Sequence, residues 1–294
     1  MHRYLRAVGF SSVQKREDFE ELMNFTAECY ETEETAVTSE GEDLSERRKT
    51  FAEHMGLLVR GVYDDKDQYR AEYCIPYFTG KAERFYEDMI IERHAEKESY
   101  AGVCDDINLG ASIIFYLQNV TEYLNRIRYG RMDQVSASLI LSGLSVEGKI
   151  LLPVYQKTPV VSEMRSSQER SRMLQAAREG DEEAIESLTM EDMDTYSMIS
   201  RRIADEDVLS IVTTHFMPCG VECDHYHVMG EILEVNLREN HKTKEKIYAL
   251  TIETNGIILD ICINQQDLMG EPMVGRRFRG IIWLQGVVNF QEKW

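Results

Sequence analysis

One stretch decides how the C-terminal part of the chain folds: IYALTIETNGIILDICI, residues 247–263. Apolar and polar residues alternate from Ile247 to Glu253 and again from Ile257 to Ile263, which is the pattern of half-buried strands. Asn255-Gly256 stands between the two runs, and this dipeptide is the strongest short-range signal for a β-hairpin turn. The stretch therefore predicts two antiparallel strands joined by a tight turn.

The β pattern extends on both sides of this hairpin, from Val221 to the last apolar run. Gly230 lies early in the first predicted strand, and Gly275 precedes a final run, RRFRGIIWLQGVV, at residues 276–288. Four to five strands in about 70 residues suit a small barrel of the oligonucleotide/oligosaccharide-binding type. An open antiparallel sheet is the alternative. We assign this β domain to residues 216–294.

Residues 1–155 are predicted to form an α+β domain. Met1 to Phe10 alternate as a first strand does, and Phe19, Leu22, Met23, Thr26 and Cys29 have the spacing of an amphipathic helix. The acidic segment 31–46 shows almost no apolar periodicity, so we expect a solvated loop there.

Period-two runs then continue to residue 156. The connections between them are too short for repeated helical crossovers, so the sheet should be mostly antiparallel. Residues 143–149 match the frame of a phosphate loop, but Ile150 replaces the required Ser or Thr and a strand follows, so a hairpin turn at Glu147-Gly148 is favoured. The predicted strands are 56–63, 69–78, 84–93, 111–117, 139–141 and 150–152.

Residues 156–215 are predicted to be a helical connector, with helices from residue 163. Ser166 and Glu169 have capping-box spacing, Gly180 can end the first helix, and Asp181 can cap the second. Thr189 can cap a third helix.

The charge balance argues against nucleic acid and membrane surfaces as partners. The chain has 52 acidic and 33 basic residues, a formal charge of −19, and none of the three segments is basic overall. Nonspecific nucleic-acid binding depends on phosphate neutralisation by Lys and Arg, and an acidic chain is repelled by an anionic bilayer.

The sequence predicts a cytoplasmic protein. No window reaches the roughly 18 apolar residues of a membrane span, and the N-terminus lacks the apolar core of a signal peptide. The six cysteines are scattered without a CxxC pair, which is typical of a reducing compartment.

Cys219, Cys223, His225 and His227 are the candidate metal ligands. On a strand, residues 223, 225 and 227 point to one face, so a thiolate and two imidazoles could converge on Zn²⁺. The spacing matches no standard zinc module, and Cys219 must bend back past Gly220. The alternative is an ordinary strand with free thiols. We expect the protein to bind no cofactor.

Arg277, Arg279 and Trp283 are the candidate anion-binding residues. Guanidinium groups beside an aromatic ring suit single-stranded nucleic acid or another anion. Alternatively, these arginines pair with the surplus of carboxylates across a contact within the chain.

The chain resembles an uncharacterised protein family of Gram-positive anaerobes, known only as a domain of unknown function. The resemblance is carried by Ala176 to Ile203, Phe216-Met217-Pro218, residues 228–232 and residues 275–286. It covers most of the chain and implies a bacterial cytoplasmic protein, but it assigns no activity or site residue. Because no complete catalytic constellation is found, a noncatalytic binding or protein-interaction protein is favoured, with a metal-dependent enzyme or sensor as the first alternative.

Overall fold

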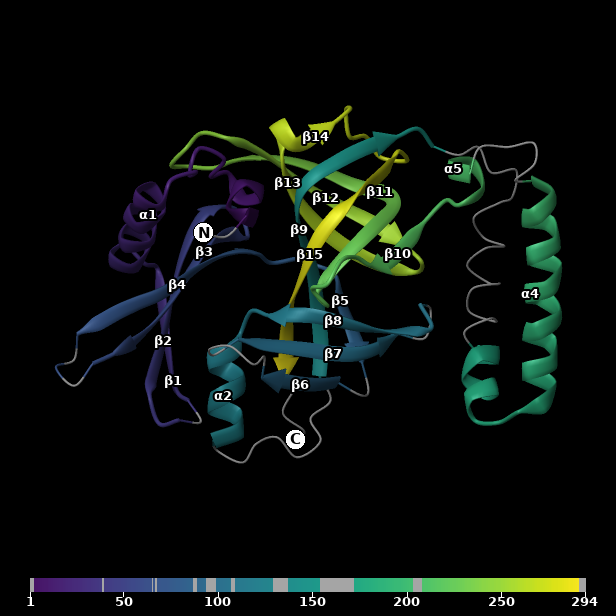
Figure 1. Cartoon of the computed structure of the whole chain (residues 1–294), viewed down its shortest axis with the longest axis horizontal. Helices are drawn as coiled ribbons and strands as arrows, with labels where there is room; N and C mark the ends of the chain where they lie inside the picture. Colours follow the sequence, from purple (N-terminus) through teal and green to yellow (C-terminus); the bar gives the residue numbers. More distant parts are fainter. Residues whose placement is uncertain are drawn as a thin grey trace.

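The fold is described from a computed structural model (Figure 1). It describes residues 3–290 except 39, 65, 67, 87–88, 94–98, 107–108, 129–136, 154–171 and 203–207. The protein is α+β and mostly β, as expected, with antiparallel and mixed sheets.

The first sheet has four antiparallel strands in the order β1-β2-β3-β4. Helix α1 (Arg16–Glu28) packs against it and buries Leu22 and Thr26, which confirms the predicted amphipathic helix. The strands are β1 (Thr32–Val37), β2 (Asp43–Ala52), β3 (Met55–Tyr63) and β4 (Tyr69–Phe78).

The second sheet is mixed, and its main path runs β10-β11-β12-β13-β9-β15-β8-β7-β6. Strands β5 and β14 pair with β9 beside this path, and β11 also pairs with β15. The strands are β5 (Glu83–Tyr86), β6 (Met89–Arg93), β7 (Tyr100–Asp106), β8 (Ala111–Leu117), β9 (Ala137–Leu151), β10 (His215–Pro218), β11 (His225–Glu239), β12 (Lys246–Thr254), β13 (Ile257–Asn264), β14 (Leu268–Met269) and β15 (Arg277–Phe290).

The hairpin predicted at residues 247–263 is present as β12 and β13. Thr254 pairs with Ile257, and the turn residues Asn255 and Gly256 have φ of 49° and 77°. Positive φ at both central positions is the requirement of the tight turn that Asn-Gly favours.

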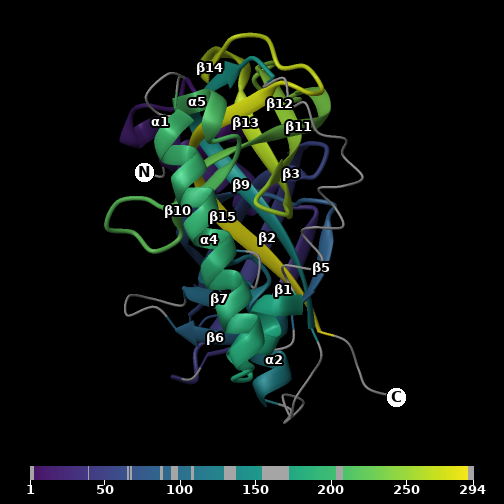
Figure 2. The same ribbon diagram turned by 90° about the vertical axis from the view of Figure 1, so that its right-hand side faces the viewer.

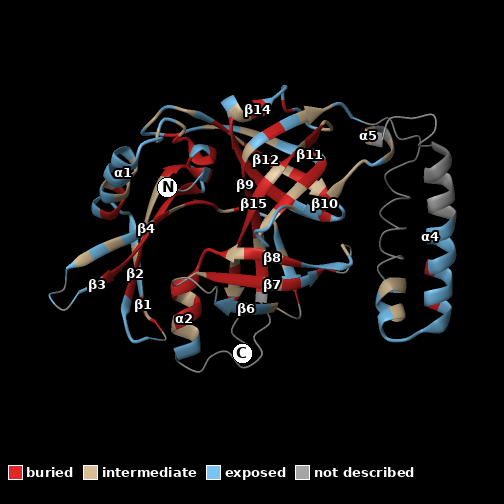
Figure 3. Cartoon of the chain, viewed as in Figure 1, coloured by how far each residue is buried: buried red, intermediate tan, exposed pale blue. Residues whose placement is uncertain are grey.

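The long strands β9 and β15 pair antiparallel along almost their whole length, from Arg277 opposite Leu151 to Phe290 opposite Ala137. Most residues of both strands are buried, as Figure 3 shows. Neighbouring strands pair with their edges, and side chains of the hydrophobic core cover their faces. Apolar side chains buried from these two strands are Leu139, Leu141, Leu144, Phe278, Ile282, Trp283, Leu284, Val288 and Phe290.

The hairpin predicted at Glu147-Gly148 is wrong, because residues 137–151 form one continuous strand. Gly148 lies opposite Gly280, and a Cβ atom on Gly148 would stand 2.5 Å from the Phe278 ring. This glycine therefore permits close packing and makes no turn.

Two predictions for the N-terminal segment are also wrong. Residues 3–8 form a 3-10 helix, η1 (Arg3–Val8), with Tyr4 and Leu5 buried. The acidic segment 31–46 contains β1 and the start of β2, because its acids find partners inside the fold: Glu33 accepts hydrogen bonds from Ser45, Arg47 and Tyr63.

Two further elements differ from the prediction. The run 84–93 is divided between β5, which pairs with β9, and β6, which pairs with β7. Residues 120–128, for which no element was predicted, form helix α2 (Val120–Arg128).

The helical connector contains helical residues 172–178, α4 (Glu182–Arg202) and α5 (Val208–Ile211). Asp181 caps α4 as predicted, because its Oδ1 accepts from the amides of Glu183 and Ala184. The cap predicted at Thr189 is wrong, since α4 runs through it. The capping box at Ser166 lies outside the described residues. Helix α4 stands beside the β10 end of the large sheet (Figures 1 and 2).

The small barrel predicted for residues 216–294 is not confirmed. Strand β9, which comes from the first half of the chain, lies between β13 and β15, and the main path of the sheet ends in the edges β10 and β6. The division at residues 155 and 216 stays a prediction, and strands from both segments share this sheet. In the described part of the chain, no helix is long and apolar enough to cross a membrane.

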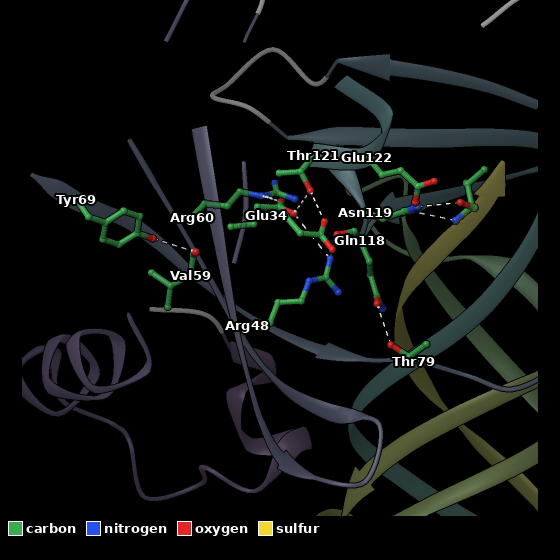
Figure 4. Close-up of polar contacts among 12 residues, drawn as sticks. Glu34, Arg48, Val59, Arg60, Tyr69, Thr79, Gln118, Asn119, Thr121 and Glu122 are labelled. Atoms are coloured by element: carbon green, nitrogen blue, oxygen red, sulfur yellow. Dashed lines mark hydrogen bonds and ion pairs between the residues drawn. The ribbon is translucent and has the colours of Figure 1, made fainter. Parts of the chain in front are cut away.

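A buried ion pair joins β2 to β3 and reaches α2 (Figure 4). The Arg60 guanidinium binds the Glu46 carboxylate, and both side chains are almost inaccessible. Thr121 Oγ1 lies 3.1 Å from Glu46 Oε2 and 2.7 Å from Glu34 Oε2, donating its single proton to one of them. Burial alone would lower the pKa of Arg60, but the Glu46 charge raises it above its ordinary value, so the guanidinium keeps its charge.

Breaking this pair should destabilise the protein strongly. We expect Arg60→Met or Glu46→Gln to lower the free energy of unfolding by about 3–5 kcal/mol, because the remaining charge stays buried without its closest partner. Removing both charges together (Arg60→Met with Glu46→Leu) should cost less than either single change. Urea denaturation followed by circular dichroism measures the difference. Arg70→Ala, which breaks an exposed ion pair with Glu72, is the control, and equal losses for Arg70→Ala and Arg60→Met would contradict this account.

Candidate functional site

A pocket of about 640 Å³ opens where η1, β7, β8, β15 and the segment before β11 meet. It contains three of the residues singled out from the sequence, Cys223, His225 and Trp283. The residues that line it are Arg3, Tyr4, Ser99, Tyr100, Ala101, Tyr116, Val221, Glu222, Cys223, Asp224, His225 and Trp283.

A tight turn brings the polar residues of the pocket to β15. Gly220 has φ of +82°, a conformation that glycine adopts without strain. The chain then folds back so that the Cys219 amide donates to the His225 carbonyl at 2.8 Å. The Leu284 amide donates to the Asp224 carbonyl at 2.9 Å, which anchors the turn on β15.

Asp224 is held from two sides. Its Oδ2 accepts from Trp283 Nε1 at 2.7 Å, and its Oδ1 lies 2.9 Å from His225 Nδ1, which donates because a carboxylate can only accept. Burial alone would raise the pKa of the Asp224 carboxyl, but the hydrogen bonds from His225 and Trp283 outweigh burial and lower this pKa. Asp224 is therefore a fixed negative charge in the pocket.

The other nitrogen of His225 faces a more accessible carboxylate. Glu222 Oε2 lies 3.2 Å from His225 Nε2, and the Glu222 side chain is 72% exposed whereas the His225 side chain is 12% exposed. The imidazole is thus oriented by Asp224 on its buried side, and its second nitrogen is accessible to any group that displaces Glu222.

Aromatic rings form the apolar part of the pocket. The Trp283 ring lies between Tyr4 and Tyr116, with ring centroids 5.5 and 5.1 Å away. Burial raises the pKa of Tyr4 to about 12, so this hydroxyl stays neutral. These tilted rings in mutual contact form the apolar wall of the pocket.

The four predicted metal ligands do not share one environment. His225 contacts Asp224 and Glu222, whereas Nδ1 of His227 lies 2.7 Å from Nε2 of His215 on the neighbouring strand β10. Among the described residues, no group of three or more His, Cys, Asp or Glu side chains is arranged to hold a metal ion. Neither Cys219 nor Cys223 forms a disulfide bond with another described residue.

The three predicted anion-binding residues have separate roles. The guanidinium of Arg277 is buried and donates to the backbone carbonyls of Leu152, Leu209 and Val212. Trp283 donates to Asp224. Arg279 is half-buried, and burial together with its charge lowers the pKa of His215 and His227. The donors of Arg277 and Trp283 are therefore already engaged within the chain.

Tyr4, Tyr116, Asp224 and His215 are among the residues of these sites that sequence reasoning missed. An acid directly before His225 was a usable local signal, since a neighbouring carboxylate commonly orients a histidine. The other three reach their partners through strand pairing or η1 packing, for which the sequence offers no local sign.

These features define a mostly β, α+β protein with an open pocket and no complete catalytic constellation among its described residues. A family model described as "Domain of unknown function, E. rectale Gene description (DUF3881)" matches residues 5–286, and the chain belongs to this family. The resemblance to an uncharacterised family of Gram-positive anaerobes is thereby confirmed. Neither a curated protein nor a solved structure matches the chain.

Replacing the fixed carboxylate should reveal its charge in a pH profile. The pKa of Asp224 in the folded protein lies below the ordinary value of 3.8, so its stabilising effect is complete above that value and is lost as the pH falls through the folded-state pKa. We expect Asp224→Asn to lower the free energy of unfolding by about 1–2 kcal/mol near neutral pH, because hydrogen bonds to a charged group are lost.

The difference between the wild type and Asp224→Asn should stay constant from about pH 5 to pH 7 and shrink below about pH 4. Chemical denaturation at each pH measures it. Glu28→Gln, on the exposed end of α1, serves as the control and should change stability by less than about 0.5 kcal/mol. A difference for Asp224→Asn that is independent of pH down to the acid limit would disprove the assignment.

Proposed function

We propose that this protein is a noncatalytic cytoplasmic binding protein and that the pocket at His225 receives its ligand. The observation that carries the proposal is Asp224, which Trp283 and His225 hold in one orientation inside an aromatic-walled pocket. Small-molecule sites typically have volumes of about 300–1,000 Å³ and combine apolar walls with a few convergent polar groups.

The surroundings support binding better than catalysis. One feature points toward catalysis: His225 and Asp224 form an oriented pair, as in sites of proton transfer. The environment of the neighbouring thiol points against it. Cys223, the thiol beside them, is exposed, and a nucleophilic cysteine requires a positive environment. Here the neighbours Glu222 and Asp224 are acidic. The lack of disulfide bonds among the six described cysteines supports the cytoplasmic part of the proposal.

The test is a thermal-shift screen of a metabolite library with the wild type, His225→Ala, and Glu28→Gln as the control. A ligand at 100 times its Kd should stabilise the wild type and the control by about 2.7 kcal/mol, and should not stabilise His225→Ala. A screen without stabilising compounds, or with compounds that stabilise all three proteins equally, would refute the pocket. A compound converted to product would make the protein an enzyme.

We also propose a second candidate function, metal binding, on a separate observation. His215 Nε2 and His227 Nδ1 lie 2.7 Å apart on adjacent strands. Burial and the charge of Arg279 lower the pKa of both imidazoles, which keeps lone pairs available at neutral pH. Two imidazoles with bonds of about 2.0–2.1 Å could hold Zn²⁺ together with water, after a small opening of the edge strand β10.

Elemental mass spectrometry on untagged protein, purified without chelators, tests this candidate. We expect about one zinc per chain, lost in His215→Gln and retained in Cys219→Ser. Loss in Cys219→Ser and Cys223→Ser but not in His215→Gln would favour the ligand set predicted from the sequence. Metal-free wild-type protein would reject both sets.

A further inference from the structure

The pocket at His225 already contains a cation supplied by the chain itself. The Arg3 guanidinium carbon lies 5.3 Å from the centre of the Tyr4 ring, over its face. Both residues line the pocket, and Arg3 is exposed. A planar guanidinium over an aromatic face is a favourable arrangement, because the ring face is negative and guanidinium is weakly hydrated.

The charged groups around this guanidinium are mostly negative. Glu222 and Asp224 line the same pocket, and their charges act on the Tyr4 hydroxyl in the direction opposite to that of Arg3. If the Arg3 side chain moved into solvent, two carboxylates would remain beside the aromatic wall with His225 between them. The formal charge of −19 also attracts cations toward the protein over longer distances.

We propose that the pocket binds the guanidinium group of a ligand, which takes the place of the Arg3 side chain over Tyr4 and is neutralised by Glu222 and Asp224. This proposal rests on the proposed function, because it names the ligand class of the same pocket. The guanidinium can come from a small metabolite or from an arginine side chain of another protein. Both sources present the same planar cation to the pocket.

Guanidinium is favoured over ammonium by its shape. A carboxylate can accept two parallel N–H bonds from a guanidinium, whereas an ammonium group is a strongly hydrated point charge. The face of Tyr4 over which Arg3 lies matches the planar group. The exposed side chain of Arg3 is displaced at small cost, since contacts between exposed charges contribute little to stability.

The experiment measures binding through the fluorescence of Trp283 in a Trp294→Phe background, which removes the second tryptophan of the chain. The probes are methylguanidinium, its neutral planar analogue N-methylurea, and methylammonium, at matched ionic strength. We expect saturable binding of methylguanidinium, weaker binding of methylammonium, and none of N-methylurea. Equal binding of N-methylurea and methylguanidinium would overturn the proposal.

Two exposed positions make the test independent of folding defects. Arg3→Gln removes the internal competitor and should tighten methylguanidinium binding, and Glu222→Gln should weaken it, each by about two- to fivefold. Glu28→Gln should leave the Kd unchanged. Weaker binding by Arg3→Gln, or an equal effect of Glu222→Gln and Glu28→Gln, would also overturn the proposal.

Two further probes distinguish the sources. Tighter binding of free arginine than of the capped peptide acetyl-Gly-Arg-Gly-amide identifies a metabolite, and the reverse order identifies a protein partner. If other library compounds bind in a way that depends on His225 while methylguanidinium does not bind, this inference fails and the proposed function stands. If no compound binds, both fail.

Discussion

The buried pair of Arg60 and Glu46 is the constraint on which the rest of the structure depends. Two charges without access to water are tolerated only when each satisfies the other, so β2 and β3 must keep their register. The Tyr116 ring lies 5.6 Å from the Arg60 guanidinium and 5.1 Å from the Trp283 ring. A displacement of β3 would therefore reach the residue that holds Asp224, and the pocket inherits its geometry from the ion pair.

Close backbone approach in the large sheet is the second requirement. Gly148 and Gly280 face each other where β9 pairs with β15, and Phe278 occupies the space that side chains would take there. This close pairing lets β9, from the first half of the chain, fill the gap between β13 and β15. The C-terminal strands would otherwise leave two unpaired edges, which is costly for buried backbone groups.

The features predicted correctly are those with local causes. The Asn255-Gly256 turn, the apolar face of α1 and the cap at Asp181 each depend on a few neighbouring residues. The acidic segment 31–46 misled the prediction because Glu33 and Glu46 are neutralised by arginines on β2 and β3. A prediction from hydrophobic periodicity treats every charged side chain as solvated. It cannot detect a partner that lies far away in the sequence. The same limitation applies to the site, where the sequence indicated His225 and Trp283 but no link between them.

The pocket is built from segments that lie almost the whole chain apart, and this explains why no contiguous motif marks it. The wall formed by Tyr4 is rigid, because two side-chain amides hold η1 in place. Asn240 donates to the Val8 carbonyl, and Asn264 donates to the Arg6 carbonyl. Arg3 begins this helix with an exposed side chain. The backbone of η1 thus stays in place while the Arg3 guanidinium can leave the pocket. The pocket therefore has a preformed shape, and exchanging the Arg3 guanidinium for another cation costs little free energy.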